Sequence, residues 1–304
     1  MLTRRTFLRH ILQLTAAGAM LGGYAVAGEP MRLKIQRYRP RPPGWPKGLR
    51  LRIAVLTDIH ACRPWMGPDR IARIVATANA LKPDLTVLLG DFSAGHRFRT
   101  AQVHSSEWAP VLGGLQAPLG VYAVMGNHDW WDDRTAQKRG SGPTIYHGRL
   151  SDAGIQVLEN DALRLTTPDG PFWLAGLGDQ LAFLPYRKYG RTRWQGVDDL
   201  PKTLAAMTDD APAILLAHEP DIFPQVPARF ALTFSGHTHG GQVRLFRHSP
   251  LVPSRFGNRY AYGHMREDDV AGAPRDLIVS GGLGCSIFPV RFGVPPEIVE
   301  ITLG

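Results

Sequence analysis

Cysteine is scarce in this sequence of 304 residues. Cys62 and Cys285 lie far apart and form no Cys-x-x-Cys pattern, so neither a disulfide framework nor a thiolate zinc site is indicated. We expect both to be small buried side chains. Export of the chain would allow the two to form one bridge, and the sequence leaves that pairing open.

A long run of lysines and arginines with interleaved aromatic residues, of the kind that tracks nucleic acid, is also absent, although the formal net charge is +9. Such a balance favours anionic small molecules or a membrane surface, and we expect no nucleic-acid partner. Internal repeats, low-complexity segments and a composition shift that would mark a second domain are absent too. With 44% hydrophobic residues, residues 49–304 are expected to form one domain. The oligomeric state stays open.

The N-terminus has an apolar segment of moderate length. Residues 11–27 are uncharged, follow the pair Arg4-Arg5 with Phe7-Leu8 behind it, and end in Ala25-Val26-Ala27. This resembles a signal for the twin-arginine export machinery, so we predict a signal peptide over residues 1–27 and a protein in the periplasm or on the outer face of the cytoplasmic membrane. The alternative is an uncleaved anchor, although the segment is marginal against the ~20 apolar residues that span a bilayer.

An Arg- and Pro-rich entry segment follows over residues 28–48, with one alternating run at Leu33–Tyr38 that could be an edge strand. Beyond it, apolar runs that read as buried strands each end in polar residues. These runs begin at Leu51, Leu85, Val121, Ala213 and Phe230. Because ligand sites collect at the carboxyl ends of strands in α/β proteins, these polar residues are expected to form one site.

The remaining patterns predict further helices and strands. Helices are expected at 69–82, 106–115, 144–153 and 200–207, and strands at 155–158, 163–166, 172–177, 242–246, 277–280 and 298–303. This is too many strands for one parallel sheet. We therefore predict an α/β fold in which two mixed β-sheets pack face to face with helices on the outside.

The strand-end motifs, in order, are similar to those of the calcineurin-like metallophosphoesterase superfamily, and most of all to its bacterial exported or membrane-associated branch. The likeness extends over about residues 50–304. The motifs are Asp58-Ile59-His60, Gly90-Asp91, Gly126-Asn127-His128-Asp129, the single His218, and Gly236-His237-Thr238-His239.

The resemblance implies a site for two divalent metal ions that share Asp91. One ion would be held by Asp58, His60, Asp91 and His239, and the other by Asp91, Asn127, His218 and His237. Carboxylate, amide and imidazole ligands suit Mn, Fe, Zn, Co or Ni. The implied activity is the hydrolysis of phosphate esters, with a metal-bridging hydroxide as nucleophile.

The resemblance implies that His128 is a non-ligand that donates to the phosphate or protonates the leaving oxygen. Many relatives carry a second carboxylate shortly after the bridging Asp, whereas here Phe92-Ser93-Ala94-Gly95 follows Asp91. What orients His128 is therefore open, and Asp129 is a candidate. The alternative for Asp129 is that it caps a helix or turn.

Two further stretches have an open role. The basic run over residues 186–194 could contact substrate or membrane, or be a solvated loop, and Trp130-Trp131 could wall the site or pack in the core. The histidines outside the motifs, such as His96, are expected to be ordinary solvated or hydrogen-bonded side chains.

The expected function is a phosphodiesterase or pyrophosphatase whose substrate could be a membrane lipid, an envelope polymer or a nucleotide. Some relatives cleave a UDP-linked diacylated sugar, and that UDP-diacylglucosamine-type activity is the alternative if the N-terminus is an uncleaved anchor. A non-catalytic metal-binding scaffold on the same fold is the other alternative.

Overall fold

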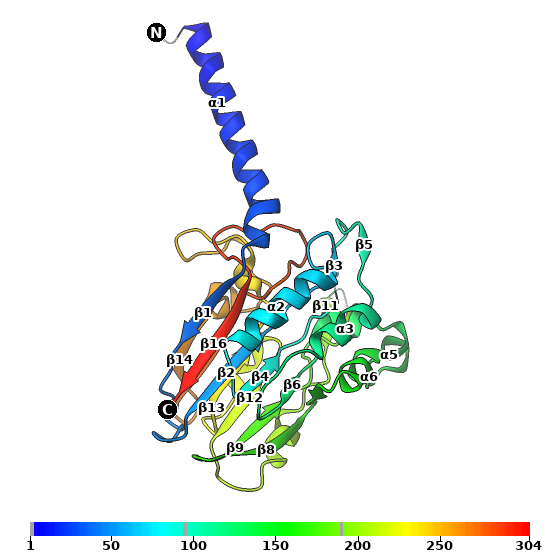
Figure 1. Cartoon of the computed structure of the whole chain (residues 1–304), viewed down its shortest axis with the longest axis vertical. Coiled ribbons are helices and arrows are strands. Elements are labelled where there is room, and N and C mark those ends of the chain that lie inside the picture. The colour runs from blue at the N-terminus through cyan, green and yellow to red at the C-terminus, as the bar shows by residue number, and fades with distance from the viewer. Residues whose placement is uncertain (1–2, 94–95, 189–190) are drawn as a thin grey trace.

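Two six-stranded sheets lie at the centre of the protein (Figure 1), in a computed structural model that describes residues 3–93, 96–188 and 191–304. The first sheet contains, in spatial order, β1 (Lys34–Tyr38), β16 (Glu297–Leu303), β2 (Leu51–Leu56), β4 (Leu85–Leu88), β6 (Val121–Ala123) and β7 (Gln156–Val157). Strands β2, β4, β6 and β7 are parallel, and β16 is antiparallel to β2. The carboxyl ends of β2, β4 and β6 therefore lie at one edge.

The second sheet has the same mixed character. It contains β14 (Gly263–Asp268), β15 (Pro274–Val279), β13 (Phe230–Ser235), β12 (Ala213–Leu216), β9 (Gly170–Gly176) and β8 (Asp161–Thr167). The four central strands are parallel, and the two edge strands, β14 and β8, are antiparallel to their neighbours. The predicted fold class, with two mixed sheets, is confirmed.

Apolar side chains fill the space between the sheets and the space under the outer helices. Leu51, Ile53 and Val55 of β2 contribute to the layer between the sheets, whereas Ala54 and Leu56 of the same strand face the helices. This alternation follows from the period of two in a strand. The helices that pack on the first sheet are α2 (Pro68–Ala80), α3 (Ser105–Leu112) and α6 (Ile145–Asp152).

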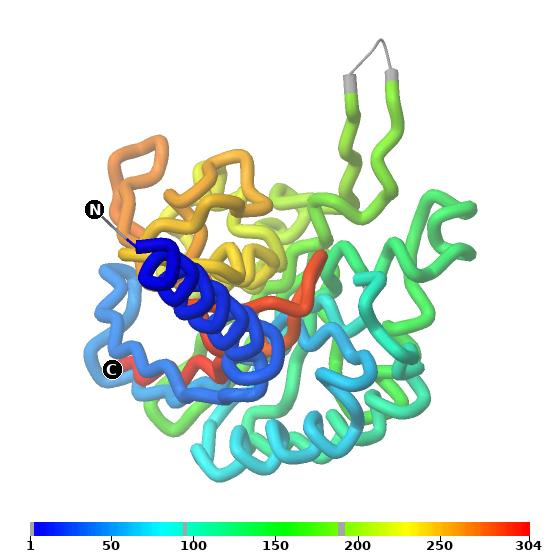
Figure 2. The backbone as a smooth tube through the Cα atoms, turned by 90° about the horizontal axis from the view of Figure 1, so that it is seen from above, coloured from blue at the N-terminus to red at the C-terminus, as the bar shows by residue number. Residues whose placement is uncertain are grey.

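The other face of the second sheet packs against α7 (Leu200–Ala205) and the 3-10 helix Pro220–Gln225. Two short helices, α4 (Asn127–Trp131) and α5 (Arg134–Arg139), follow β6. Small antiparallel pairs are formed by β3 (Cys62–Arg63) with β5 (Ala101–Gln102), and by β10 (Phe183–Lys188) with β11 (Arg191–Gln195). In Figure 2 the β10–β11 hairpin extends from the body.

The strand predicted at 242–246 is wrong, because this segment forms only isolated bridges, Val243 with Phe292 and Leu245 with His248, in a loop beside residues 286–292. The basic run at 186–194 lies mostly in the β10–β11 hairpin, and its residues 189–190 lie outside the described residues, as do Ala94 and Gly95. Both cysteines are buried and unpaired.

The N-terminal segment forms a helix, α1 (Arg4–Gly23), that projects from the body (Figure 1). With its short helical continuation it spans Arg4–Met31 and is long and apolar enough, by length and composition, to cross a membrane. Its base is packed onto the domain: Ala25 accepts a hydrogen bond from the Arg291 amide at 2.9 Å, and Glu29 and Pro30 are buried. The predicted edge strand of the entry segment is β1, at the edge of the first sheet.

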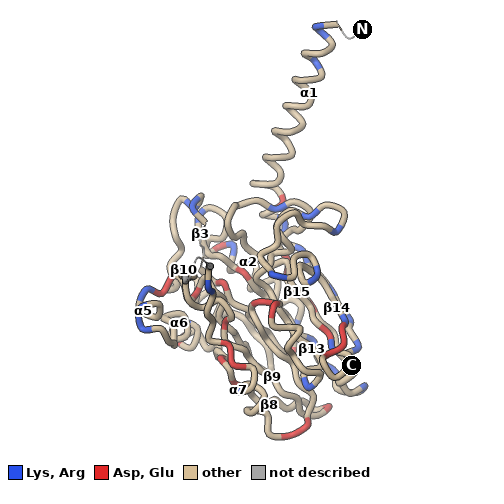
Figure 3. The backbone as a smooth tube through the Cα atoms, turned by 180° about the vertical axis from the view of Figure 1, so that it is seen from behind, with Lys and Arg blue, Asp and Glu red and all other residues tan. Residues whose placement is uncertain are grey.

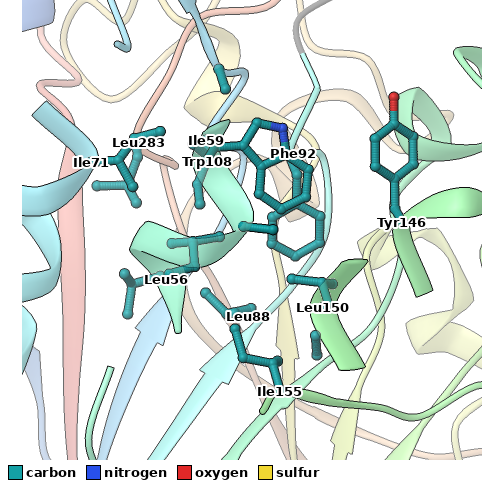
Figure 4. Packing of buried hydrophobic residues seen from close by; sticks show 14 of the residues in the cluster. Leu56, Ile59, Ile71, Leu88, Phe92, Trp108, Tyr146, Leu150, Ile155 and Leu283 are labelled. Atoms are coloured by element: carbon teal, nitrogen blue, oxygen red, sulfur yellow. The ribbon is translucent and has the colours of Figure 1, made fainter. Parts of the chain in front are cut away.

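Replacing Trp108 by alanine should lower the free energy of unfolding by about 3–5 kcal/mol, because the indole is buried and its removal leaves a cavity. Trp108 stacks on Phe92 and on Tyr146, with ring centroids 5.2 and 5.9 Å apart (Figure 4). Denaturant unfolding measures the change. The matched control is Val270→Ala on a side chain that is 96% exposed, which should change stability by less than about 0.5 kcal/mol. Equal effects of the two substitutions would contradict the packing described.

Candidate active site

The predicted site residues meet at the edge where the carboxyl ends of both sheets converge. Asp58 and His60 follow β2, Asp91 follows β4, and Asn127 to Asp129 form the first turn of α4 after β6. His218 follows β12, and the pair His237 and His239 follows β13. Except for His128 and His237, which are partly buried, these side chains are buried.

The backbone at this edge is unusual. Asp58, His60, Asp91, His237 and His239 all have φ between 46° and 66°. For residues with a side chain this left-handed region costs about 1–2 kcal/mol each. Hydrogen bonds across strand ends hold the backbone there, for example from the Asp58 amide to the Gly90 carbonyl and from the His60 amide to the Asp91 carbonyl, both at 3.0 Å. Strain of this kind is typical of functional sites.

Glycine is required where the loops touch. A Cβ on Gly126 would lie 2.6 Å from the Asp91 amide nitrogen and 2.8 Å from Cε1 of His218. The loop after β6 therefore approaches the loops after β4 and β12 more closely than any side chain would permit.

Asp91 lies between two groups of metal-ligating atoms. Its Oδ2 is 3.5 Å from Nε2 of His60 on one side and 3.3 Å from Nε2 of His218 on the other. Its Oδ1 accepts a hydrogen bond from the backbone amide of His128 at 2.9 Å. One carboxylate thus faces both groups.

The first group consists of Asp58, His60 and His239. Nε2 of His239 is 3.0 Å from Nε2 of His60 and 3.5 Å from Oδ1 of Asp58. The second group consists of Asp91, His218 and His237, and Nδ1 of His237 is 3.0 Å from Oδ1 of Asn127. His237 and His239, two residues apart, therefore lie in different groups.

Backbone carbonyls fix the orientation of two imidazoles. Nδ1 of His60 is 2.9 Å from the Ser93 carbonyl, and Nδ1 of His218 is 2.5 Å from the Leu89 carbonyl. Because a carbonyl only accepts, both Nδ1 atoms carry the proton and donate it, and both Nε2 atoms turn toward Asp91. This is how metal-ligating histidines are commonly held.

When no cation is bound, burial sets the direction in which the pKa values of Asp58, His60 and His237 shift. It raises the pKa of Asp58 to about 7, with a further contribution from the Asp91 charge, and it lowers the pKa of His60 to about 3 and that of His237 to about 4. For Asp91 and His218 burial is outweighed by their mutual attraction. The pKa of Asp91 is therefore held well below its ordinary value and that of His218 well above it.

These atoms fit divalent cations. The Nε2 atoms of His60 and His239 face each other at 3.0 Å, Nε2 of His218 is 3.3 Å from Oδ2 of Asp91, and all three imidazoles are buried. A divalent cation would take the place of the protons that otherwise lie between these converging imidazole and carboxylate groups. The thiolate-free donor set suits first-row divalent ions.

Asp129 holds backbone in place. Its carboxylate accepts hydrogen bonds from the amides of Gly126, Asp91 and Phe92 at 2.9 Å, and from the amide of Ser93 at 3.3 Å. This arrangement fits the capping alternative and links the loops after β4 and β6. The ring of His128 instead contacts the rings of His60 and Trp131, at centroid distances of 4.9 and 5.1 Å.

A cavity of about 850 Å³ opens beside these residues. Asp91, Asn127, His128, His237 and His239 contribute to its lining. Its lining combines apolar side chains, among them Trp131, Trp194, Leu251, Ile287 and Phe288, with charged ones, among them Arg97, Asp198, Asp221 and Arg255.

Some of the lining was not expected from the sequence. Trp131 lines the cavity, whereas Trp130 is in the core. Each of the two roles considered for this pair is therefore filled by one tryptophan. Trp194 comes from the basic run and stacks on Trp131 at 6.0 Å. His96 is buried in the lining and lies in hydrogen-bond contact with Sγ of Cys62 at 3.5 Å, which agrees with the hydrogen-bonded side chain expected of it.

Buried carboxyl groups near His218 were also missed. Asp179 and Glu219 lie within one potential metal-ligating group with His218. Both had an available signal, because Glu219 adjoins His218 and Asp179 follows the strand predicted at 172–177, which is parallel to β12. Burial and the Glu219 charge raise the pKa of Asp179 well above its ordinary value.

The fold and site define a metal-dependent phosphoester hydrolase. Residues 51–241 match the family model described as calcineurin-like phosphoesterase, and the chain belongs to this family. The predicted superfamily is thereby confirmed.

Three relatives show how far the similarity extends. The chain is 30% identical to the uncharacterized metallophosphoesterase YkuE of Bacillus subtilis, with 99% of this chain and 98% of that protein covered. It is 29% identical to the phosphodiesterase YaeI of Escherichia coli, with 86% and 89% covered. It is also 32% identical to a transmembrane protein with a metallophosphoesterase domain of Danio rerio, with 99% and 63% covered.

Metal affinity should rise by at least about tenfold between pH 6 and pH 8. With a pKa of about 7, the Asp58 carboxyl is mostly protonated at pH 6, and a cation has to displace that proton before it binds the carboxylate. The proton held by His218 acts in the same direction. Titration calorimetry with Mn²⁺ in buffers of different ionisation enthalpy measures both affinity and proton release. An affinity that is constant over this range, without proton release, would contradict the protonation described.

Proposed function

We propose that the site binds two divalent transition metal ions (Mn, Fe, Zn, Co or Ni) that share Asp91. Asp58, His60 and His239 complete one set of ligands, and Asn127, His218 and His237 complete the other. The observation that carries this proposal is the position of the Asp91 carboxylate, with Oδ2 within 3.5 Å of an Nε2 atom from each set. The chemistry that such ions supply is polarisation of a phosphoryl oxygen and acidification of a water.

The residues of the chain prepare the site for hydrolysis of a phosphodiester or pyrophosphate. The left-handed loops and the Asp129 contacts fix the ligands before substrate arrives, so little reorganisation is needed at the moment of reaction. The name of the Escherichia coli relative, a phosphodiesterase, supports the diester class.

His128 is proposed as the proton donor to the leaving oxygen. Its ring lies at the cavity wall, next to His60, and its own backbone amide is bound to Asp91. The contacts with His60 and Trp131 orient the ring, in the place of the carboxylate that many relatives carry after the bridging Asp. Asp129 is proposed to support this step indirectly, by holding the turn from which His128 projects.

We also propose that α1 is retained as an anchor rather than removed with residues 1–27. The residues around the expected cleavage point are helical and contact the domain, although Tyr24 and Val26 are exposed: Tyr24 contacts Phe292, Val26 accepts a hydrogen bond from Trp65, and Pro30 is buried. A chain exported by the twin-arginine route crosses the membrane folded, so a peptidase that needs extended backbone would first have to unwind this helical segment.

Substituting His128 by alanine should leave metal content unchanged and reduce turnover by about 10²- to 10⁴-fold on alkyl diesters. The loss should be smaller on bis-p-nitrophenyl phosphate, because its leaving group needs little protonation. Metal analysis and steady-state kinetics with Mn²⁺ give both results. His248→Ala, at an exposed histidine outside the site, is the matched control. Unchanged turnover in His128→Ala would refute the role of proton donor, and wild-type protein with less than about one bound ion per chain would favour a scaffold.

Retention of α1 predicts an intact N-terminus. Full-length protein with a C-terminal tag should be found in the membrane fraction, resist carbonate extraction, and have an intact mass that includes residues 1–27. Lysines in place of Arg4 and Arg5 should block export, and the chain should keep residues 1–27, with its mass changed only by the two substitutions. A soluble periplasmic protein that begins at Gly28 would show that the segment is a cleaved signal instead.

A further inference from the structure

Exposed apolar side chains gather on three loops at the active-site end of the domain. These site-end loops are residues 96–99, 243–251 and 286–290. Their most exposed apolar side chains are Phe98, Leu245, Phe246, Leu251, Ile287 and Phe288, and Phe246 is fully exposed. Exposed apolar groups of this density are typical of an interaction surface.

The site-end loops form one continuous surface. The rings of Phe98 and Phe288 lie 5.7 Å apart although each is more than half exposed. Gln242 joins the second loop to the third, because its side-chain amide donates to the Phe288 carbonyl at 3.0 Å and its side-chain oxygen accepts from the Ser286 amide at 2.6 Å. Leu251, Ile287 and Phe288 also line the cavity, so this surface reaches the entrance of the active site.

The charge of this surface has one sign. Residues 96–99, 243–251 and 286–290 contain Arg97, Arg99, Arg244 and Arg247 and no aspartate or glutamate. Arg97 and Arg247 are exposed. Figure 3 shows lysines and arginines on the loops at the end of the body from which α1 projects. Arginines beside exposed aromatic rings suit an anionic lipid surface.

The base of α1 packs against the same end. Tyr24 contacts Phe292, which directly follows the third loop, with ring centroids 6.4 Å apart, and the Arg291 amide binds the Ala25 carbonyl. A membrane that holds α1 would therefore lie next to the site-end loops rather than at the opposite end of the sheets (Figure 1).

We propose that the site-end loops dock onto the anionic lipid bilayer in which α1 is anchored, with Phe98 and Phe246 in the headgroup region. A second copy of the chain is a poorer occupant, because it would bring arginines against arginines with no acidic residue in the loops. When the site-end loops are docked, the entrance of the cavity lies at the depth of the lipid headgroups. Resting on the proposed function, this assigns the phosphoester of a membrane lipid as the substrate class.

The test uses an environment-sensitive fluorophore (NBD) attached through maleimide to Phe246→Cys in the full chain. The matched site is Val270→Cys, an equally exposed residue in the β14–β15 turn. That turn lies at the opposite end, because β15 begins there and runs parallel to β13, whose carboxyl end carries His237. The native thiols should react slowly at pH 7, since burial raises the pKa of Cys62 to about 11 and also raises that of Cys285.

In liposomes of phosphatidylglycerol and phosphatidylcholine, emission from position 246 should shift to the blue and rise about twofold or more, and nitroxide-labelled lipid should quench it. Emission from position 270 should not change, and phosphatidylcholine alone should give a weaker signal at 246. Equal behaviour of the two positions would overturn the proposal. So would a shift at 246 that appears in detergent and grows with protein concentration, because it would assign the surface to a second copy.

Kinetics test the substrate class separately. The double variant Phe98→Ser, Phe246→Ser should hydrolyse a vesicle-embedded phosphodiester about tenfold more slowly than wild type, while hydrolysis of soluble bis-p-nitrophenyl phosphate stays unchanged. Unchanged hydrolysis of both by the variant would overturn the proposal. A wild-type protein that hydrolyses neither substrate would refute the proposed function, while the fluorescence still reports whether the loops dock.

Discussion

The carboxylate of Asp91 is the point on which the architecture of the site depends. It lies between two groups of buried donors, with one oxygen 3.5 Å from His60 and 3.3 Å from His218. To bring these atoms together, strands of two sheets must end at the same edge and five residues must adopt a left-handed backbone. Such an arrangement opposes folding, because it buries charge and stores strain. The apolar layers between and outside the sheets offset that cost, and bound cations would reduce it further.

The sequence predicted the fold class and the members of the site because the relevant signals are local. Each buried strand is a short apolar run, and each site residue comes directly after one, so the carboxyl ends could be recognised without knowing the pairing. The structure places His237 and His239 in different groups of candidate ligands, and their assignment to different metal ions stays a prediction. The roles of residues that depend on long-range contacts were harder to predict from the sequence. Asp129 was considered as a partner of the His128 ring, whereas its carboxylate binds backbone amides on both sides of the site.

The missed features share one physical cause. The strand expected at 242–246 has the alternation of a strand, but its neighbour is a loop that offers only isolated bridges. Its side chains therefore remain exposed, and Phe246 is fully so. The basic run at 186–194 became a hairpin because two of its segments pair with each other, and Trp194 then reaches Trp131. The pattern of apolar and polar residues in one segment does not show which other segment will pair with it.

Helix α1, the site-end loops and the proposed metal ligands lie close together. Arg291 illustrates this: its backbone amide binds Ala25 at the base of α1, while its buried guanidinium lies 3.2 Å from Nδ1 of His239 and donates to the carbonyls of Gly281 and Val294. Arg291 thus contacts both the segment that joins α1 to the domain and a proposed metal ligand, His239. A domain held this way would keep the entrance of its cavity at a fixed depth relative to the membrane. For a hydrolase whose substrate is part of the bilayer, that constraint replaces a diffusional search in three dimensions with one along the surface.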